Sequence, residues 1–185
     1  NDRLLSVALV RRFVAANRLA KLLIDEQVFG KVLSFQMDDA RVFSWPIKTP
    51  FLVNPSYPGR GVLIGNGSHF FDLVLWWFGD VAHVSCIADA RNGGETDATV
   101  TLKMQSGAEG LMRLSRVRAL EDKVRITFEN AVLELPPFGS DVRLLDREGR
   151  PLIGAIPEID DSMATNSSHL AELMALQIED FVTAT

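Results

Sequence analysis

The strongest constraint on the fold is a strict alternation of apolar and polar residues in the second half of the chain. Between Asp97 and Met104 every even position is apolar and every odd position is polar. Successive side chains of a β-strand point to opposite faces, so this period of two predicts a strand with one buried face. Ser106-Gly107 marks a turn after it, and residues 110–117 are predicted to form the returning strand.

The same period recurs along the rest of the chain. Residues 123–128 alternate in this way, and after the turn at Glu129-Asn130 the apolar residues Ala131, Leu133 and Leu135 follow the same period. Residues 142–146 are one more candidate strand. An earlier strand is predicted over 31–37, with Leu33, Phe35 and Met37 on one face. Consecutive strands joined by short turns favour an antiparallel sheet, and their polar positions indicate one face that is wet or paired with another surface.

Three segments carry helical patterns instead. Residues 15–28 are amphipathic, and residues 68–78 are apolar almost all round, which is typical of a helix buried on more than one side. A final helix is predicted over 169–183, with an N-cap at Ser167 or Ser168. Its inward residues are predicted to be Leu170, Leu173, Met174, Ile178 and Phe181.

No regular strand–helix alternation connects these elements, which argues against a doubly wound parallel sheet. The sequence therefore predicts an α+β fold, with a largely antiparallel open sheet and helices on one face. Residues 1–185 are expected to form a single domain. Residues 45–60 contain four prolines and are predicted to form a long loop.

Composition excludes several classes of function. The 185 residues are 47% hydrophobic and 23% charged, which argues against disorder, and a net charge of −5 argues against nucleic-acid binding. Arg113, Arg116 and Arg118 are interpreted mainly as solvated strand residues, with a ligand site as the alternative. No signal peptide and no apolar run of the roughly 18 residues needed for a membrane span is found, so no membrane partner is expected.

The single cysteine, Cys86, excludes an internal disulfide and a thiolate zinc site. It lies in an apolar run, where a buried thiol is expected, and the lack of disulfides favours a cytoplasmic location. Asp38-Asp39 and Asp160-Asp161 are interpreted as solvated turn residues, so no metal site is predicted.

Two local features are candidates for chemistry. Gly59, Gly61 and Gly65 have a spacing one residue too long for a dinucleotide-binding fingerprint and follow a proline-rich loop instead of a strand, so that interpretation is rejected. His69 lies at the start of the apolar helix, where the helix N-terminus lowers the pKa of an imidazole and favours the neutral base. The alternative is a partly buried histidine hydrogen-bonded by backbone groups.

The stretch from Gly59 to Leu73 resembles the signature of the glucose–fructose oxidoreductase / inositol 2-dehydrogenase (Gfo/Idh/MocA) family. That pattern runs roughly G-G-G-x-L-x-D-x-G-x-H-x-x-D and precedes an apolar helix ending in glycine. Residues 12–32 are similar to the family's helix and first strand after the nucleotide-binding domain, and residues 177–181 resemble its returning helix.

The resemblance implies a division of labour. In such enzymes an N-terminal Rossmann domain binds NAD or NADP, and the C-terminal α+β domain contributes substrate contacts and the oligomer interface. This chain would be the second part only, with no cofactor of its own and a homodimer or higher oligomer formed through the sheet face. By position, His69 would be the catalytic acid/base and Asp72 a structural residue. The residues expected near the substrate are Arg12, Trp45, Tyr57 and Asn66.

The function implied for the parent protein is hydride transfer between a nicotinamide and a sugar-like or cyclitol alcohol, with this fragment inactive alone. One departure from the pattern supports an alternative, a non-catalytic ligand-binding or dimerisation module. The acidic residue that usually stands four positions before the histidine is Gly65 here, and Arg60 replaces a usual glycine. A carboxylate at position 65 would orient the imidazole and contact the sugar.

Overall fold

Short turns and period-two strands combine into one open sheet. The computed structural model describes residues 7–42, 61–89, 94–136, 141–152 and 167–183. Within these residues, seven strands pair in the order β2-β3-β4-β1-β5-β6-β7. The strands are β1 (Val32–Ala40), β2 (Val81–Ala88), β3 (Asp97–Met104), β4 (Glu109–Ser115), β5 (Lys123–Phe128), β6 (Val132–Leu135) and β7 (Arg143–Leu145).

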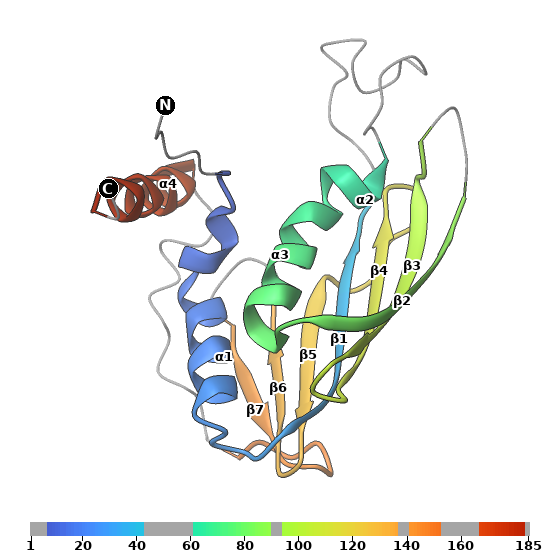
Figure 1. Ribbon diagram of the computed structural model, residues 1–185, viewed down its shortest axis with the longest axis vertical. Coiled ribbons are helices and arrows are strands. Elements are labelled where there is room, and N and C mark those ends of the chain that lie inside the picture. The colour runs from blue at the N-terminus through green and yellow to red at the C-terminus, as the bar shows by residue number, and fades with distance from the viewer. Residues whose placement is uncertain (1–6, 43–60, 90–93, 137–140, 153–166, 184–185) are drawn as a thin grey trace.

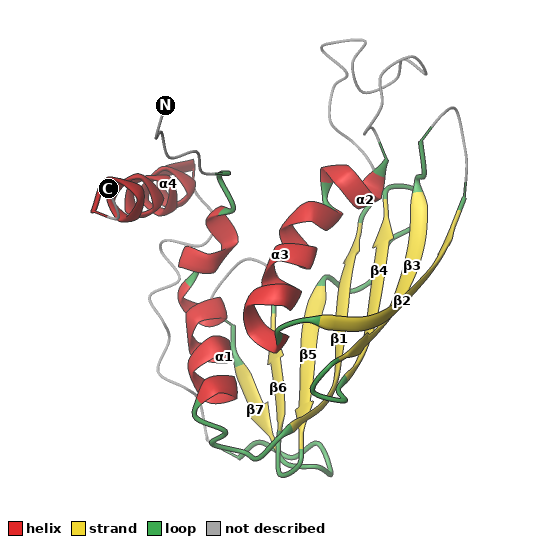
Figure 2. Ribbon diagram, in the orientation of Figure 1, coloured by secondary structure: helices red, strands yellow, loops and turns green. Residues whose placement is uncertain are grey.

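The helices gather on one side of this sheet. They are the short 3-10 helix η1 (Val10–Phe13), α1 (Ala15–Asp25), α2 (Val62–Gly65), α3 (Gly67–Phe78) and α4 (Ser167–Thr183). Figure 1 shows α1 and α3 lying across one face, while α4 lies farther out, beside the N-terminal segment. The opposite face carries no helix in the described part of the chain (Figure 2). The predicted α+β class, with an open sheet and helices on one face, is confirmed.

Strand pairing is antiparallel with one exception. β1 lies between β4 and β5; it is antiparallel to β5 but parallel to β4, with Phe35 opposite Gly110. Parallel neighbours end at the same edge of a sheet, so Ala40 and Ser115 lie side by side. Helix α2 lies at this same edge (Figure 1). The parallel pairing therefore brings the C-terminal ends of β1 and β4 close to the start of α2.

The core forms where α3 meets the sheet. Phe70, Leu73 and Trp77 are buried, as the all-round apolar pattern predicts. Phe78 stacks on Phe35 of β1, with ring centroids 4.2 Å apart and planes 13° from parallel. The indole Nε1 of Trp77 donates a hydrogen bond of 3.0 Å to the carbonyl of Asn17, which ties α3 to α1. Burying each large apolar side chain stabilises the fold by about 1.5–3 kcal/mol, so α3 is firmly held.

Three expectations about burial in the strands were wrong. Asp38 and Asp39 are not solvated turn residues, because β1 continues to Ala40 and buries both, at 4% and 6% exposure. Leu33 is 42% exposed, next to an irregularity in the pairing of β1 with β5. Cys86 is exposed, because β2 is an edge strand over which the described residues place no further layer.

The last helix also differs from its prediction. Of the five residues expected to face inward, only Leu173 is buried. The other four, Leu170, Met174, Ile178 and Phe181, are between 36% and 64% exposed. Helix α4 contacts η1, and Gln177 donates a hydrogen bond of 3.2 Å to the carbonyl of Val7. The helical pattern of α4 identifies its apolar residues, but the described part of the chain covers few of them.

Gly110 provides a test of the core. A Cβ built on it would lie 2.2 Å from the Phe35 ring, so Gly110→Ala must displace the ring stacked on Phe78. We expect a loss of about 1–3 kcal/mol in the free energy of unfolding, measured by urea denaturation. The double variant Gly110→Ala/Phe35→Leu should lose less than the sum of the single variants, because the smaller side chain leaves room. Wild-type stability in Gly110→Ala would contradict this packing.

Candidate functional site

The candidate site lies where α2 and α3 begin, at the edge where β1 and β4 end. Helix α2 is fixed by the 94–96 segment, because Val62 N–H donates to the carbonyl of Glu95 at 2.9 Å. Leu63 N–H donates to the Glu95 carboxylate at 2.9 Å. Asn66 joins α2 to α3 in a helical conformation and accepts a hydrogen bond from His69 N–H. Gly65 and His69 are therefore about one turn apart.

His69 is half-buried within this framework. Its Nδ1 is enclosed and forms no hydrogen bond with any described residue. Burial lowers the pKa of His69 below its usual 6.5, and the positive charge of Arg11 lowers it further, although Asp72 and Asp39 oppose the change. The imidazole is therefore mostly neutral at pH 7, which is the form that accepts a proton.

Arg11 and Asp39 form a buried charged pair behind the histidine. The Arg11 guanidinium lies 4.1 Å from the centroid of the Phe70 ring and 3.9 Å from the Asp39 carboxylate. Burial lowers the pKa of Arg11 to about 10, against the opposing effect of Asp39, so the side chain stays charged at neutral pH. This fixed positive charge is one of the reasons why His69 favours its neutral form.

Asn66 connects this pair to Arg116, the residue just after β4. Its Nδ2 donates to the carboxylate of Asp39 at 3.1 Å. Its Oδ1 accepts from the guanidinium of Arg116, at 3.4 Å from Nη2. The amide is therefore oriented by a carboxylate on one side and a cation on the other, which fixes which end of the side chain faces each neighbour.

Arg12, expected near the substrate, makes a two-point ion pair. Its Nε and Nη2 donate to the two oxygens of Asp72 at 2.9 and 2.5 Å, which links η1 to α3. The hydrogen bonds to Asp72 raise the pKa of Arg12. The guanidinium also lies 5.7 Å from the centroid of the Trp76 ring. Arg12 is thus held by Asp72, which lies about one helical turn after His69 in α3, and much of its donor capacity is directed at that carboxylate.

The other expected residues divide into two groups. His69 and Asn66 come together with Arg12 and Asp72 around the start of α3. Trp45 and Tyr57 lie outside the described residues. Sequence reasoning missed Arg11, Asp39 and Arg116 as members of the site. Of the three arginines grouped together in the sequence, Arg113 pairs with Asp38 and Arg118 with Asp97, and only Arg116 reaches α2.

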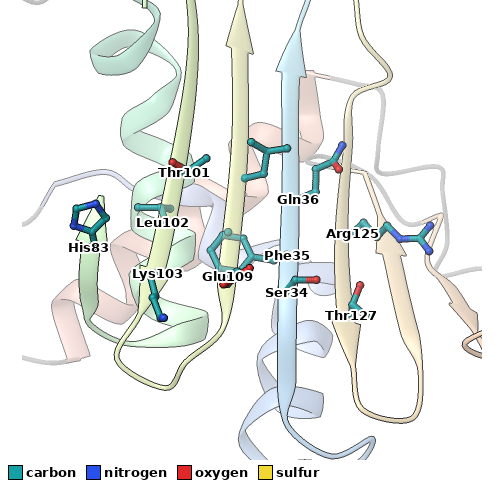
Figure 3. A pocket seen from close by; sticks show the side chains of 12 residues that line it. Ser34, Phe35, Gln36, His83, Thr101, Leu102, Lys103, Glu109, Arg125 and Thr127 are labelled. Carbon is teal, nitrogen blue, oxygen red and sulfur yellow. The ribbon is translucent and has the colours of Figure 1, made fainter. Parts of the chain in front are cut away.

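A hollow lies on the other face of the sheet. It measures about 600 Å³ and is bordered by residues of five strands, among them Gln36, Thr101 and Arg125. Figure 3 looks onto this face, with the helices behind the strands. It is separated from His69 by the sheet itself, so it is not part of the same site.

Comparison with known proteins identifies the family. The GFO/IDH/MocA C-terminal domain family matches residues 17–134, which is more than half of the chain. The chain therefore belongs to this family. No curated protein matches it in sequence.

Solved structures share the fold at low sequence identity. The match with an oxidoreductase from Thermotoga maritima covers 100% of this chain and 53% of the Thermotoga chain, with 16% sequence identity and a TM-score of 0.72. Levoglucosan dehydrogenase, in complex with NADH and levoglucosan, matches 76% of this chain and 42% of its own, with 18% identity and a TM-score of 0.66. The match with an inositol dehydrogenase homologue from Azotobacter vinelandii, complexed with NAD+, covers 78% of this chain and 44% of the homologue, with 22% sequence identity and a TM-score of 0.65. This chain spans about half the length of these proteins.

Two other kinds of feature are absent from the part of the chain that the structure describes. No helix there combines the length and apolar character that a membrane span needs. No group of three or more His, Cys, Asp or Glu residues there is arranged to hold a metal ion.

The pKa of His69 is directly measurable. We expect its Cε1–H NMR signal to titrate with a midpoint below 6.5, and His69→Gln assigns the signal by removing it. As pH falls through 6.5, the unfolded chain takes up this proton before the folded chain does. The free energy of unfolding should therefore fall below pH 6.5, and this contribution should vanish in His69→Gln. A midpoint at or above 6.5 would contradict the environment described.

Proposed function

We propose that this chain is the substrate-binding domain of a nicotinamide-dependent oxidoreductase that acts on a sugar-like or cyclitol alcohol. His69 is the residue that exchanges the hydroxyl proton. The observation that carries the proposal is the half-buried imidazole at the start of α3, with its Nδ1 enclosed and in surroundings that lower its pKa. The low-identity neighbours that hold NADH with levoglucosan, or NAD+, support the same class of reaction.

The chemistry assigned to His69 follows from its surroundings. Oxidation of an alcohol removes a hydride from carbon and a proton from the hydroxyl oxygen. A neutral imidazole accepts that proton, and returns it when the carbonyl is reduced. Because Nδ1 is enclosed, we assign the exchange to Nε2. Arg11 keeps the imidazole neutral before the reaction, and Asp39 and Asp72 stabilise the imidazolium after it.

The cofactor has to be held mainly by residues outside the described part of the chain. When bound, the nicotinamide accepts or returns the hydride. The start of α2 does not fit a pyrophosphate, because the N–H groups of Val62 and Leu63 already donate to Glu95. The residues around His69 fit the alcohol end of the reaction, where Asn66 offers an oriented amide.

The open sheet face is the second functional surface of the proposal. We propose that it packs against a second copy of the chain to form a dimer or a higher oligomer. The face combines polar residues such as Thr101 and Lys103 with a broad hollow, and no helix of the described chain covers it. A helix-free sheet face commonly packs against another sheet.

A non-catalytic binding or dimerisation module is the second candidate. It is favoured by Gly65, which carries no side chain at a position one turn before His69. The two candidates differ in what His69 does, because a module requires no proton exchange.

Catalysis is tested in the full-length protein that we propose. His69→Ala should lower the turnover rate for oxidation of the alcohol substrate by about 10²-fold or more, measured as the increase in NAD(P)H absorbance. The matched control is His169→Ala, which removes an imidazole from the first turn of α4. Equal turnover in His69→Ala and the wild type would exclude a catalytic His69 and favour the module.

Assembly is tested separately by sedimentation velocity. The wild-type chain should be a dimer or larger at roughly tens of micromolar. Leu111→Arg places a charge in the sheet-face hollow and should shift the equilibrium toward monomer. Asn130→Arg adds the same charge at the exposed turn between β5 and β6 and should leave the state unchanged. A monomeric wild-type chain under these conditions would overturn the assembly proposal.

A further inference from the structure

The edge strand β2 lacks the features that usually protect the edge of a sheet. It is the outermost strand on its side, and no other strand of the described residues pairs with its outer edge. At the opposite edge, β7 has only three residues, and the chain folds back over it in a bridge between Leu145 and Pro151. A short strand covered in this way is protected against pairing with another chain, whereas β2 is eight residues long.

The side chains of β2 do not protect the edge either. Residues 81–88 contain no Lys, Arg, Asp or Glu and no Pro, although charges and prolines are the usual means of blocking an edge. Seven of the eight residues are exposed, with Val84 at 55% and Ile87 at 79%. Exposed, uncharged segments of high β-propensity pair readily with other strands. β2 therefore has the composition of a paired strand at the position of an edge strand.

The pairing of β2 with β3 determines which backbone groups point outward. Asp89 N–H donates to the carbonyl of Asp97 at 3.0 Å, and the two strands are antiparallel without a register shift between residues 83 and 88. In such a pair, residues that exchange hydrogen bonds alternate with residues whose N–H and C=O groups point away from the partner. Every second residue before Asp89 therefore bonds to β3. The outward groups belong to Val84, Cys86 and Ala88.

The same three residues form an apolar row on one face of the sheet. Val84 and Cys86 lie opposite Leu102 and Val100 of β3, which belong to the buried core on the helix side. Directly opposite residues have their side chains on the same face. The core residues of β3 are covered, but their neighbours on β2 are exposed. The apolar surface on the helix side thus continues to the edge of the sheet without a cover from the described residues.

A second copy of β2 complements this edge in hydrogen bonding, polarity and charge. If two β2 strands pair antiparallel about a two-fold axis at Cys86, Val84 of one copy lies opposite Ala88 of the other. Each outward N–H then meets an outward carbonyl, because the paired residues are the ones whose groups point away from β3. The two apolar rows join on one face, and the paired strands bring no like charges together.

We infer that β2 is a second assembly surface, at which two copies of the chain pair edge to edge and join their sheets. This contact uses the backbone of one edge strand, whereas the assembly described under the proposed function uses the open sheet face. The inference therefore does not depend on that proposal. One two-fold contact gives a dimer, and two different two-fold contacts together give a tetramer.

A proline at position 86 tests the pairing in sedimentation velocity at roughly tens of micromolar. Cys86→Pro removes an outward N–H but no hydrogen bond to β3, a position at which an edge strand tolerates proline. We expect it to halve the mass of the assembly, and near-UV circular dichroism checks its fold. The matched control, Cys86→Ser, keeps the N–H and should assemble like the wild type. Ile87→Lys, a charge on an exposed side chain, should act like the proline.

Leu111→Arg separates the edge contact from the sheet-face contact. The edge contact should persist in Leu111→Arg, and the double variant Cys86→Pro/Leu111→Arg should be a monomer. Equal masses for the wild type and both β2 variants, Cys86→Pro and Ile87→Lys, would overturn the edge contact and leave the sheet face untouched. A wild-type dimer that is lost in Cys86→Pro and kept in Leu111→Arg would support the edge contact and exclude the sheet face.

Amide hydrogen exchange tests the hydrogen bonds directly. In the assembled wild type, the amides of Val84, Cys86 and Ala88 should exchange about tenfold or more slowly than in a sample diluted until it dissociates. The amides of Ser85 and Ile87 face β3 within the same chain, so they should be protected in both samples. Fast exchange of the outward amides in the concentrated sample would overturn the inference. Slow exchange in a monomer would overturn it too, because the edge would then be covered from within the chain.

Discussion

The burial of α3 against the sheet is the interaction on which the site depends. Phe70, Leu73 and Trp77 anchor the helix, and the stack of Phe78 on Phe35 is possible only because Gly110 leaves room for the ring. Each anchor follows His69 by a few residues on the same rigid element. The histidine is therefore positioned by apolar packing, and its partners need only adjust its charge. Buried apolar contacts are non-directional, but together they fix one helix orientation.

Arg11 and Asp39 adjust that charge, and Asn66 and Arg116 extend the same row of polar groups. Arg11, Asp39, Asn66 and Arg116 come from η1, β1, the α2–α3 junction and the residue after β4. The parallel pairing of β1 with β4 brings the C-terminal ends of these two strands to the same edge of the sheet. A fully antiparallel arrangement at this point would separate Asp39 from Arg116. One irregularity in an otherwise antiparallel sheet thus assembles the polar half of the site.

Much of the fold was predictable because its signals are local. The alternation from Asp97 to Met104 requires only neighbouring residues, and β3 has the predicted bounds. Asp39 carried a usable signal too, since it shares the parity of Phe35 and Met37 and therefore faces the helices. The exposure of Phe181 and Cys86 was not predictable in this way. It depends on which surfaces the chain places over α4 and β2, and local periodicity holds no information about that.

The site is less predictable than the fold because its members are coupled across the chain. Read alone, Gly65 is a missing side chain and Arg116 is one more arginine at the end of a strand. Together they define one feature, because the guanidinium occupies the volume that the glycine leaves open. The close approach is thus a property of the pair, and only the three-dimensional structure reveals a contact between two residues 51 positions apart.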